Sequence, residues 1–494
     1  MTSTDLETFD SVNPATGEVL ATVSVHDAAS IDAAVAAARP AAQWWGGLGF
    51  KERARRLRQW RGWLVNHANE LAELVHEENG KPVDDAIIEI SVAVEHLDWA
   101  ATHAGKVLRR TSTRPGLLAV NHGASVEYVP FGVVGVIGPW NWPVHTPLGS
   151  ISYALAAGNA VVFKPSEYTP LIGQWLADSF SRLTTEQPVF TVVTGRAETG
   201  AALCRSGVDK LAFTGSTATG KKVMAACAET LTPVVIECGG KDAMIVAADA
   251  DIEAAAAGAA WGGMSNGGQT CVGIERVYVV APVYERYVAS LVSQTSELRA
   301  GDDRTADYGP ITVPGQLDVI AAHIDEALDA GATALVGGRN SVQAPYVGPV
   351  VLADVPADSR AEQDETFGPT LTVTRVRDED EAIARANGTK LGLGAAVYSA
   401  RRGRAIAEQL RCGMVSVNSV LTFASVPSLP FGGVGASGFG RIHGPDGLRE
   451  FARSRAVTVK RAPAPIEIAS FARKPGAIKS LATVVQARWG RSRY

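Results

Sequence analysis

Cysteine is scarce in this chain of 494 residues, which holds five cysteines and no pair in C-x-x-C spacing. Such usage argues against a disulfide framework and against a cysteine-ligated zinc site, so we expect reduced thiols, a cytoplasmic protein and no metal site. Long apolar runs are also lacking, and no stretch is continuous enough to cross a bilayer. The opening residues, MTSTDLETFDSVNPATG, are polar and acidic, and we therefore expect no secretory signal peptide.

An excess of positive charge is missing as well. The formal net charge is −5, which gives no reason to expect nucleic acid as a partner. The content of 46% hydrophobic and 20% charged residues is typical of a globular protein. Because a chain of this length exceeds what one compact core supports, two or three domains are expected.

Short apolar segments alternate with helical ones through most of the chain. Helical periodicity covers residues 27–45, 51–79 and 84–105, and Gly80 marks a helix end. Apolar runs closed by Gly, Pro, Ser or Thr follow from Tyr128, and they read VGVIGP, AVVFKPS, VFTVVTG, KLAFTGS and TPVVIECGG. This alternation predicts βαβ units around a parallel sheet, whose ligands bind at the carboxyl ends of the strands.

A second series of strand-like runs begins near Cys271. It reads RVYVV, PVVLADV, TLTVTRV, LGAAVYS and GMVSVNS, and it predicts a second α/β domain. The segment after about Ala462 differs, being basic and able to place Ile478, Leu481, Val485 and Trp489 on one helical face.

Cys271 stands in the stretch NGGQTCVGIERV, where Gly267 and Gly268 precede a strand-like run. A flexible loop of this kind can present a thiol to a cleft, although a free cysteine is also commonly a buried packing residue. Three further stretches supply what a catalytic cysteine needs. Asn141 in GPWNWP offers an amide donor, Glu237 in IECGGK a desolvated carboxylate, and Glu365 in ETFGP a second acid. Taken singly, each of the three has an ordinary structural explanation.

Taken together, the motifs resemble the aldehyde dehydrogenase superfamily. In the family's order, the chain contains GPWNWP, FKPSEYTP, FTGSTATG, IECGGK, GGQTC, ETFGP, NGTKLGLGAAVYS and PFGGVGASGFGR. The opening SVNPATGEVLATV also resembles the family's N-terminal hairpin. The resemblance implies that Cys271 attacks the aldehyde, that Asn141 and the Cys271 amide hold the oxyanion, and that Glu237 activates water to cleave the thioester. Cys238, which follows Glu237, departs from the family pattern and is expected to be a packing residue.

The same resemblance implies a nicotinamide cofactor bound by a Rossmann-like domain. Glu167 should accept hydrogen bonds from ribose hydroxyls and repel a 2′-phosphate, which favours NAD and leaves NADP possible. The residues that match cofactor-binding positions are Trp140, Lys164, Glu167, Gly195, Gly215, Ser216, Gly220, Glu365 and Phe367.

Three parts are expected in the chain. Residues 1–112 and 131–238 would form the cofactor domain, and residues 239–450 would form the second α/β, catalytic domain. Residues 113–130 and 451–494 would form a small oligomerisation element, which implies a homodimer or homotetramer. The basic C-terminal segment could instead lie on an anionic membrane surface, but an oligomer arm or flap is the favoured reading.

The substrate is expected to be a small aldehyde with an apolar aliphatic or aromatic body. Trp142, His145, Trp261, Met264 and Phe423 are the candidate pocket residues. Succinate semialdehyde is the rival, but it needs a cationic anchor and WPVHTPLGSIS contains no arginine. Arg276 is not diagnostic, and His443 is expected to be structural.

Two other classes of function make different demands on these residues. A CoA-acylating enzyme would not require Glu237, and a non-catalytic binding or structural protein on the same fold would tolerate the loss of a catalytic group. Asn141, Glu237 and Cys271 are all present, which favours a hydrolytic aldehyde dehydrogenase.

Overall fold

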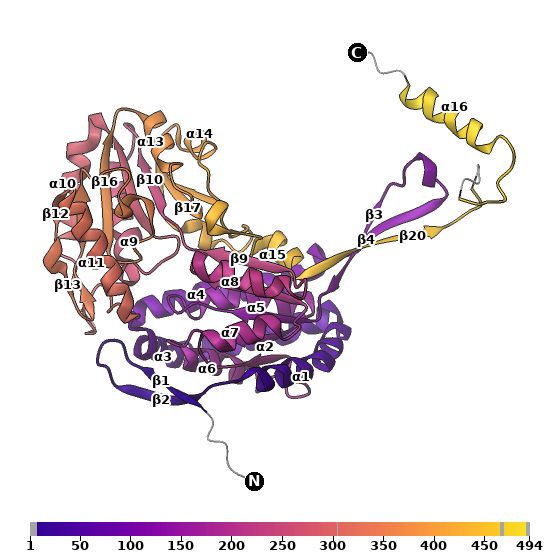
Figure 1. The fold of residues 1–494 in the computed structure, drawn as a ribbon, viewed down its shortest axis with the longest axis horizontal. Helices are drawn as coiled ribbons and strands as arrows, with labels where there is room; N and C mark the ends of the chain where they lie inside the picture. The colour runs from indigo at the N-terminus through magenta and orange to yellow at the C-terminus, as the bar shows by residue number, and fades with distance from the viewer. Residues whose placement is uncertain (1–6, 304, 465–468, 491–494) are drawn as a thin grey trace, which may run out of the picture. The chain divides into compact units, whose positions relative to one another are not determined.

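The computed structural model describes residues 7–303, 305–464 and 469–490 (Figure 1). The chain divides into two compact units, Met1–Val107 with Pro130–Ala452 and Leu108–Val129 with Arg453–Tyr494. The first unit contains both large sheets, and the second contains a small sheet and the helix α16 (Ala477–Trp489).

An antiparallel hairpin opens the first unit, as the resemblance implied. It consists of β1 (Thr8–Val12) and β2 (Val19–Ser24). Four helices follow, namely α1 (Ala28–Gly47), α2 (Gly49–Asn66), α3 (Ala68–Asn79) and α4 (Val83–Val107). The expectation of one helix over residues 51–79 is wrong, because the chain leaves helical geometry at His67, where φ is −115°. Gly80 ends α3 with a φ of 91°, as predicted.

The first sheet has six strands in the order β19-β9-β8-β5-β6-β7. They are β5 (Val133–Ile137), β6 (Ala160–Lys164), β7 (Phe190–Val192), β8 (Lys210–Gly215), β9 (Val234–Cys238) and β19 (Gly438–Phe439). All pairs are parallel except the one between β19 and β9, so the predicted parallel sheet is confirmed. The connecting helices are α5 (His145–Ala157), α6 (Pro170–Ser181), α7 (Ala197–Arg205) and α8 (Thr217–Ala228).

The helices explain why these strands read as continuous apolar runs. Helix α5 packs against β5 and β6, and α1 also contacts β6. Helix α4 packs against α5 (Figure 1). Strand β6 is buried at all of its positions. A strand covered on both faces has no solvent side, and polar residues therefore do not alternate along it.

The second sheet has seven strands in the order β12-β15-β16-β11-β10-β17-β18. They are β10 (Asp242–Val246), β11 (Ile274–Val280), β12 (Thr333–Val336), β15 (Val350–Ala353), β16 (Thr370–Val376), β17 (Gly394–Tyr398) and β18 (Met414–Val417). Only β12 and β15 pair antiparallel. The second α/β series is thus confirmed, and its sheet begins at Asp242, earlier than the run near Cys271.

Helices cover the second sheet on both faces. One core lies against α9 (Ile252–Met264) and α10 (Tyr284–Thr295), and another against α13 (Glu379–Ala386) and α14 (Gly403–Ala407). The remaining helices are α11 (Pro314–Asp329), α12 (Arg360–Gln363) and α15 (Gly444–Glu450), and β13 (Val342–Gln343) pairs with β14 (Tyr346–Val347). Short 3₁₀ turns are η1 (Leu117–Ala119), η2 (Ser265–Gly268), η3 (Ala281–Val283), η4 (Arg339–Ser341), η5 (Thr422–Ser425) and η6 (Gly435–Ser437).

The second unit has a three-stranded sheet in the order β20-β4-β3. Its strands are β3 (Thr111–Thr113), β4 (His122–Pro130) and β20 (Ala452–Lys460). Helix α16 confirms the helix expected in the C-terminal segment, and its side chains Ile478, Val485 and Trp489 are exposed. Among the helices of the described residues, none combines the length and apolar character required to span a membrane.

Candidate active site

Cys271 lies between η2 and β11, half-buried, on the wall of a cavity. The residues before it turn sharply, since Asn266, Gly267 and Gly268 have φ angles of 55°, 63° and 72°. A Cβ atom on Gly268 would lie 2.0 Å from the carbonyl oxygen of Gly368. Both its conformation and this close approach therefore require glycine, and the glycine-rich approach to the thiol has a steric cause.

Side-chain amides hold this loop in place. The Gln269 amide nitrogen donates to the carbonyl oxygen of Asn266 at 2.8 Å and to that of Pro310 at 3.2 Å. The Gln269 amide oxygen accepts a 2.9 Å bond from the backbone N–H of Thr312. Gln269 is 1% exposed, so these bonds are shielded from water and fix the backbone two residues before Cys271.

Asn141 contacts the same loop from the end of β5. Its side-chain amide donates a 2.9 Å hydrogen bond to the backbone carbonyl of Gln269, and the residue is 4% exposed. The backbone carbonyl oxygen of Asn141 accepts 3.0 Å bonds from the Lys81 ammonium and from the side-chain amide of Asn266. An amide has two N–H donors, and the bond to Gln269 orients the group beside the thiol loop.

A fully buried ion pair contacts the backbone of Asn141. Lys81 and Glu89 have fully buried side chains, with 2.5 Å between Nζ and Oε2. The other oxygen of Glu89 accepts bonds from the backbone N–H groups of Val144 and His145, at 2.7 and 2.9 Å, at the start of α5. The Lys81 ammonium also lies 3.8 Å from the centre of the Trp142 ring. One pair thus anchors both the Asn141 backbone and the helix that follows.

Glu237 lies at the end of β9 and is 3% exposed. By distance and angle, neither carboxylate oxygen has a hydrogen-bond partner among the described residues. Burial raises the pKa of Glu237 to about 7, against weaker opposing effects of the Thr214 hydroxyl and the Cys271 thiol. A carboxylate with this pKa can accept a proton near neutral pH, which is the property required of a general base.

The thiol of Cys271 is surrounded by acidic groups. Burial, followed by the charges of Glu237, Glu365 and Asp242, raises its pKa well above the usual thiol range. The thiol is therefore protonated at neutral pH, and its proton must leave before sulfur attacks a carbonyl. Cys238 is 2% exposed and its sulfur lies 3.0 Å from the Cβ position of Gly220, consistent with a packing role.

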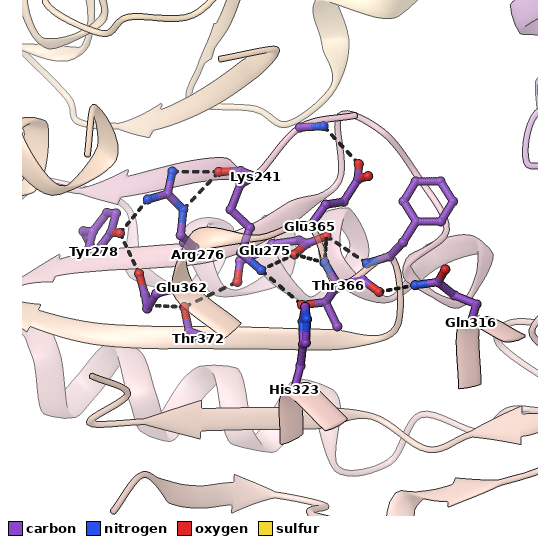
Figure 2. Close-up of polar contacts among 12 residues, drawn as sticks. Lys241, Glu275, Arg276, Tyr278, Gln316, His323, Glu362, Glu365, Thr366 and Thr372 are labelled. Atoms are coloured by element: carbon purple, nitrogen blue, oxygen red, sulfur yellow. Dashed lines mark hydrogen bonds and ion pairs between the residues drawn. The ribbon is translucent and has the colours of Figure 1, made fainter. Parts of the chain in front are cut away.

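A buried polar network holds the loop of Glu365 and Phe367 (Figure 2). Lys241 forms an ion pair with Glu275, and Glu275 accepts bonds from the backbone N–H groups of Thr366 and Phe367. The Thr366 hydroxyl oxygen accepts a 3.1 Å bond from the Lys241 ammonium and lies 3.0 Å from Nδ1 of His323. The Thr366 carbonyl oxygen accepts a 2.7 Å bond from the Gln316 side-chain amide. This support fixes Glu365, whose Oε1 accepts a 3.0 Å bond from the Gly240 amide.

The cofactor residues predicted from the sequence form two groups. Lys164 and Glu167 lie at the end of β6, with 3.9 Å between ammonium and carboxylate. Ser216 follows β8 and caps the exposed N-terminus of α8, its hydroxyl accepting a 3.2 Å bond from the Thr219 amide. Gly215 and Gly220 flank that turn. Trp140 and Phe367 form a separate group in edge-to-face contact, with 5.5 Å between ring centres.

A model of the aldehyde dehydrogenase family matches residues 1–457. The chain belongs to this family. It is 37% identical over 453 residues to a 4,4′-diapolycopene aldehyde oxidase from a Methylomonas species, covering 90% of this chain and 84% of that protein. It is also 37% identical to a glutarate-semialdehyde dehydrogenase from Pseudomonas aeruginosa, covering 89% of this chain and 91% of that protein.

Solved structures agree with the family assignment. An NAD-dependent aldehyde dehydrogenase from Sinorhizobium meliloti superimposes with a TM-score of 0.89 and 33% identity, covering 93% of each chain. The α/β architecture of this aldehyde dehydrogenase is thereby confirmed. Members of the family use nicotinamide cofactors, and this aldehyde dehydrogenase is an oxidoreductase of that kind.

The residues of this aldehyde dehydrogenase fit such a cofactor. The N-terminus of α8 suits a pyrophosphate, because the first amides of a helix are unpaired donors at the positive end of its dipole. A Cβ on Gly195 would lie 2.0 Å from the Thr199 hydroxyl, so only glycine fits this position at the edge of the sheet. Lys164 and Glu167 provide polar groups for ribose hydroxyls, and the Trp140–Phe367 pair an apolar wall.

The cavity beside Cys271 is lined mainly by apolar and aromatic residues, including Trp142, His145 and Trp261 of the predicted set. The expectation that Met264 and Phe423 line it is wrong. Met264 is 1% exposed and packs in the core between α9 and the second sheet, and Phe423 packs behind the lining residue Phe431, with 6.4 Å between ring centres.

Charged lining residues of this cavity are acidic. Asp85 and Glu89 contribute to the wall, and no lysine or arginine does so within the part of the chain that the structure describes. Arg276 is 2% exposed, and its guanidinium donates to the carbonyl oxygens of Lys241 and Ala386 at 2.7 and 3.1 Å. Arg276 is therefore a structural residue that holds the backbone at Lys241 and Ala386.

Sequence reasoning missed Gln269, Asp85 and the Lys81–Glu89 pair. Gln269 could have been found from its place in GGQTC, directly ahead of the thiol. Lys81 pairs with a residue that is not at helical i, i+3 or i, i+4 spacing, so no local pattern marks the contact. Asp85 reads as an ordinary acidic residue in the first turn of α4.

Proposed function

We propose that this enzyme oxidises apolar aliphatic or aromatic aldehydes to carboxylates, with Cys271 as nucleophile and NAD as the preferred hydride acceptor. The observation that carries the proposal is the position of Cys271 on the wall of the apolar cavity, with Asn141 and Glu237 supplied from the ends of two strands. We further propose that the cofactor and catalytic domains have the boundaries expected from the sequence.

In the first step, the thiol proton is released to solvent in the cavity, and the Cys271 sulfur attacks the aldehyde carbon, whose carbonyl oxygen becomes an oxyanion. The new oxyanion is bound by the free N–H of the Asn141 amide and by the backbone N–H of Cys271. A nicotinamide held by Glu365 and Phe367 would supply the hydride acceptor, and loss of hydride from the adduct would leave a thioester on Cys271. The fixed loop geometry holds the sulfur and the donors in place throughout.

In the second step, Glu237 removes a proton from water, and the resulting hydroxide attacks the thioester carbon. The carbon–sulfur bond breaks, the carboxylic acid product leaves, and the thiol is regenerated. Because the pKa of Glu237 is raised to about 7, a substantial fraction is in the basic form at neutral pH. This step distinguishes hydrolytic release from transfer to coenzyme A.

The apolar substrate is inferred from the cavity. The names of the relatives include both 4,4′-diapolycopene aldehyde and glutarate semialdehyde, so they do not choose between an apolar and an anionic substrate. A semialdehyde carries a distal carboxylate that needs a cationic partner. The charged wall residues Asp85 and Glu89 are acidic, which disfavours succinate semialdehyde as the alternative substrate.

Two further parts of the proposal concern cofactor choice and assembly. Glu167 would repel the 2′-phosphate of NADP, so NAD is favoured. The second unit presents a small sheet and exposed apolar residues on α16, a combination that suits contact with another copy. We therefore propose a homodimer or homotetramer.

The test is the rate of reduced-cofactor formation with a panel of aldehydes, using NAD and NADP in parallel. Hexanal, octanal and benzaldehyde represent the apolar class, succinate semialdehyde the anionic class, and acetaldehyde is the small reference. A higher kcat/KM for the apolar compounds with NAD supports the proposal. A preference for succinate semialdehyde would contradict the assigned substrate class.

A further inference from the structure

Three histidines from distant parts of the sequence meet beside the cavity wall. His96 lies in α4, His145 is the first residue of α5, and His443 directly precedes α15. The ring centres of His96 and His443 are 3.9 Å apart. The ring centre of His145 lies 5.2 Å from that of His96 and 5.6 Å from that of His443. One nitrogen from each ring lies within 4.8 Å of the other two.

Several ring nitrogens of this cluster lack hydrogen-bond partners. Within the described residues, the Nδ1 atoms of His96 and His145 and both ring nitrogens of His443 have no hydrogen bond. His96 and His443 are 0% and 1% exposed. A buried polar nitrogen without a partner is costly, and the grouping of such nitrogens in three neighbouring rings calls for a common ligand.

His96 has the hydrogen bonding of a metal ligand. Its Nε2 lies 2.9 Å from the carbonyl oxygen of Ala424, so Nε2 carries the proton and donates it there. The Nδ1 lone pair is thereby left available to a metal ion. A histidine that binds a metal typically donates its other ring N–H to a carbonyl or carboxylate, which fixes the tautomer and orientation.

The backbone and packing around His443 favour the same interpretation. His443 has φ 61° and ψ 164°, a conformation that strains any residue other than glycine. A Cβ on Gly149 would lie 2.4 Å from the Nε2 atom of His443, so a glycine on α5 makes room for the ring. A strained backbone that places an unpartnered imidazole in a fitted space is typical of functional sites.

We propose that His96, His145 and His443 form a binding site for a divalent transition-metal ion of the zinc type. Three neutral imidazoles are a suitable donor set for zinc, with a fourth position left for another ligand.

Geometry sets one requirement for this site. Nitrogens bound to a tetrahedral zinc ion at about 2.1 Å lie about 3.4 Å apart, so nitrogens at the observed upper limit of 4.8 Å must close by about 1.4 Å. His145 and Ala424 both belong to the wall of the apolar cavity, which gives an ion access to the cluster. The sequence contains no cysteine zinc motif. That observation does not bear on this site, because its ligands are all histidines far apart in sequence.

The experiment is a zinc titration of untagged full-length protein by isothermal calorimetry, after treatment with a chelator. All variants carry Cys271→Ser, which removes the active-site thiol as a competing ligand. We expect one zinc ion per chain, and a loss of affinity of at least about 100-fold on His443→Asn or His96→Asn. Zinc should also raise the Tm of the parent but not of these variants.

His103→Asn is the matched control. His103 lies on the same helix as His96, but stacks on Trp99 with 4.5 Å between ring centres and is outside the cluster. This variant should bind zinc like the parent. Zinc binding that is weak in the parent, or equal in the cluster variants and the control, would overturn the proposal. Should His443→Asn fail to fold, His145→Asn provides the second test.

Discussion

The side-chain amide of Asn141 donates a 2.9 Å hydrogen bond to the backbone carbonyl of Gln269, two residues before Cys271. This bond connects the end of β5 in the first sheet to the loop that precedes β11 in the second. It uses one N–H of the amide, and the proposed mechanism assigns the other to an oxyanion formed on Cys271. On that proposal, oxyanion stabilisation depends on the alignment of two sheets.

Replacing Asn141 by alanine should lower kcat by about 10²- to 10³-fold, because one oxyanion donor is lost. The measurement is single-turnover formation of reduced cofactor, which isolates thiol attack and hydride transfer. NAD affinity, measured by calorimetry, should be unchanged. An unaltered single-turnover rate would remove Asn141 from the oxyanion site.

Replacing Lys81 by methionine should destabilise the protein by about 3–5 kcal/mol, because Glu89 would remain charged and buried without its partner. Unfolding in urea at constant pH measures the change. The control is Arg404→Met, which breaks the exposed i, i+4 pair with Glu408 and should leave stability unchanged. Equal effects of the two substitutions would show that the buried pair is not a structural anchor.

The activity should depend on the protonation of Glu237. Its charged form is the base, and its pKa is about 7, so thioester hydrolysis should slow as the pH falls below 7. Glu237→Gln should reduce hydrolysis by about 10²- to 10⁴-fold and abolish this part of the pH profile. Hydrolysis that keeps the same pH dependence in the glutamine variant would identify another group as the base.

Asp85 should disfavour anionic substrates. Asp85→Asn removes a carboxylate from the cavity wall, so kcat/KM for succinate semialdehyde should rise relative to that for octanal. Asp84→Asn, which changes the exposed neighbour outside the cavity, is the matched control. A constant ratio of the two substrates in both variants would show that Asp85 does not act on the distal group.

The sequence alone predicts much of the fold for a definable reason. Strands such as β6 are buried along their whole length, so they appear as uninterrupted apolar runs ended by turn residues. The break between α2 and α3 was missed because the apolar spacing continues through His67 while the backbone does not. Helical periodicity reports which face is buried and is insensitive to one irregular residue.

The candidate site divides in the same way. Cys271, Glu237 and Asn141 stand in short motifs at strand ends and could be identified from the sequence. Glu89 and the three clustered histidines could not, because their partners are brought close only by the packing of α4, α5 and α15 on one another. Those contacts depend on tertiary structure, and no residue spacing encodes them.

The central claim is that Cys271 carries the acyl group and that Glu237 releases it. The most direct test mixes Glu237→Gln enzyme with NAD and octanal, and follows reduced cofactor in the first turnover, with mass spectrometry of the quenched protein. The account predicts a burst of one reduced cofactor per site, an octanoyl group on Cys271, and neither in Cys271→Ala. A burst in the alanine variant, or an acyl group on another residue, would contradict it.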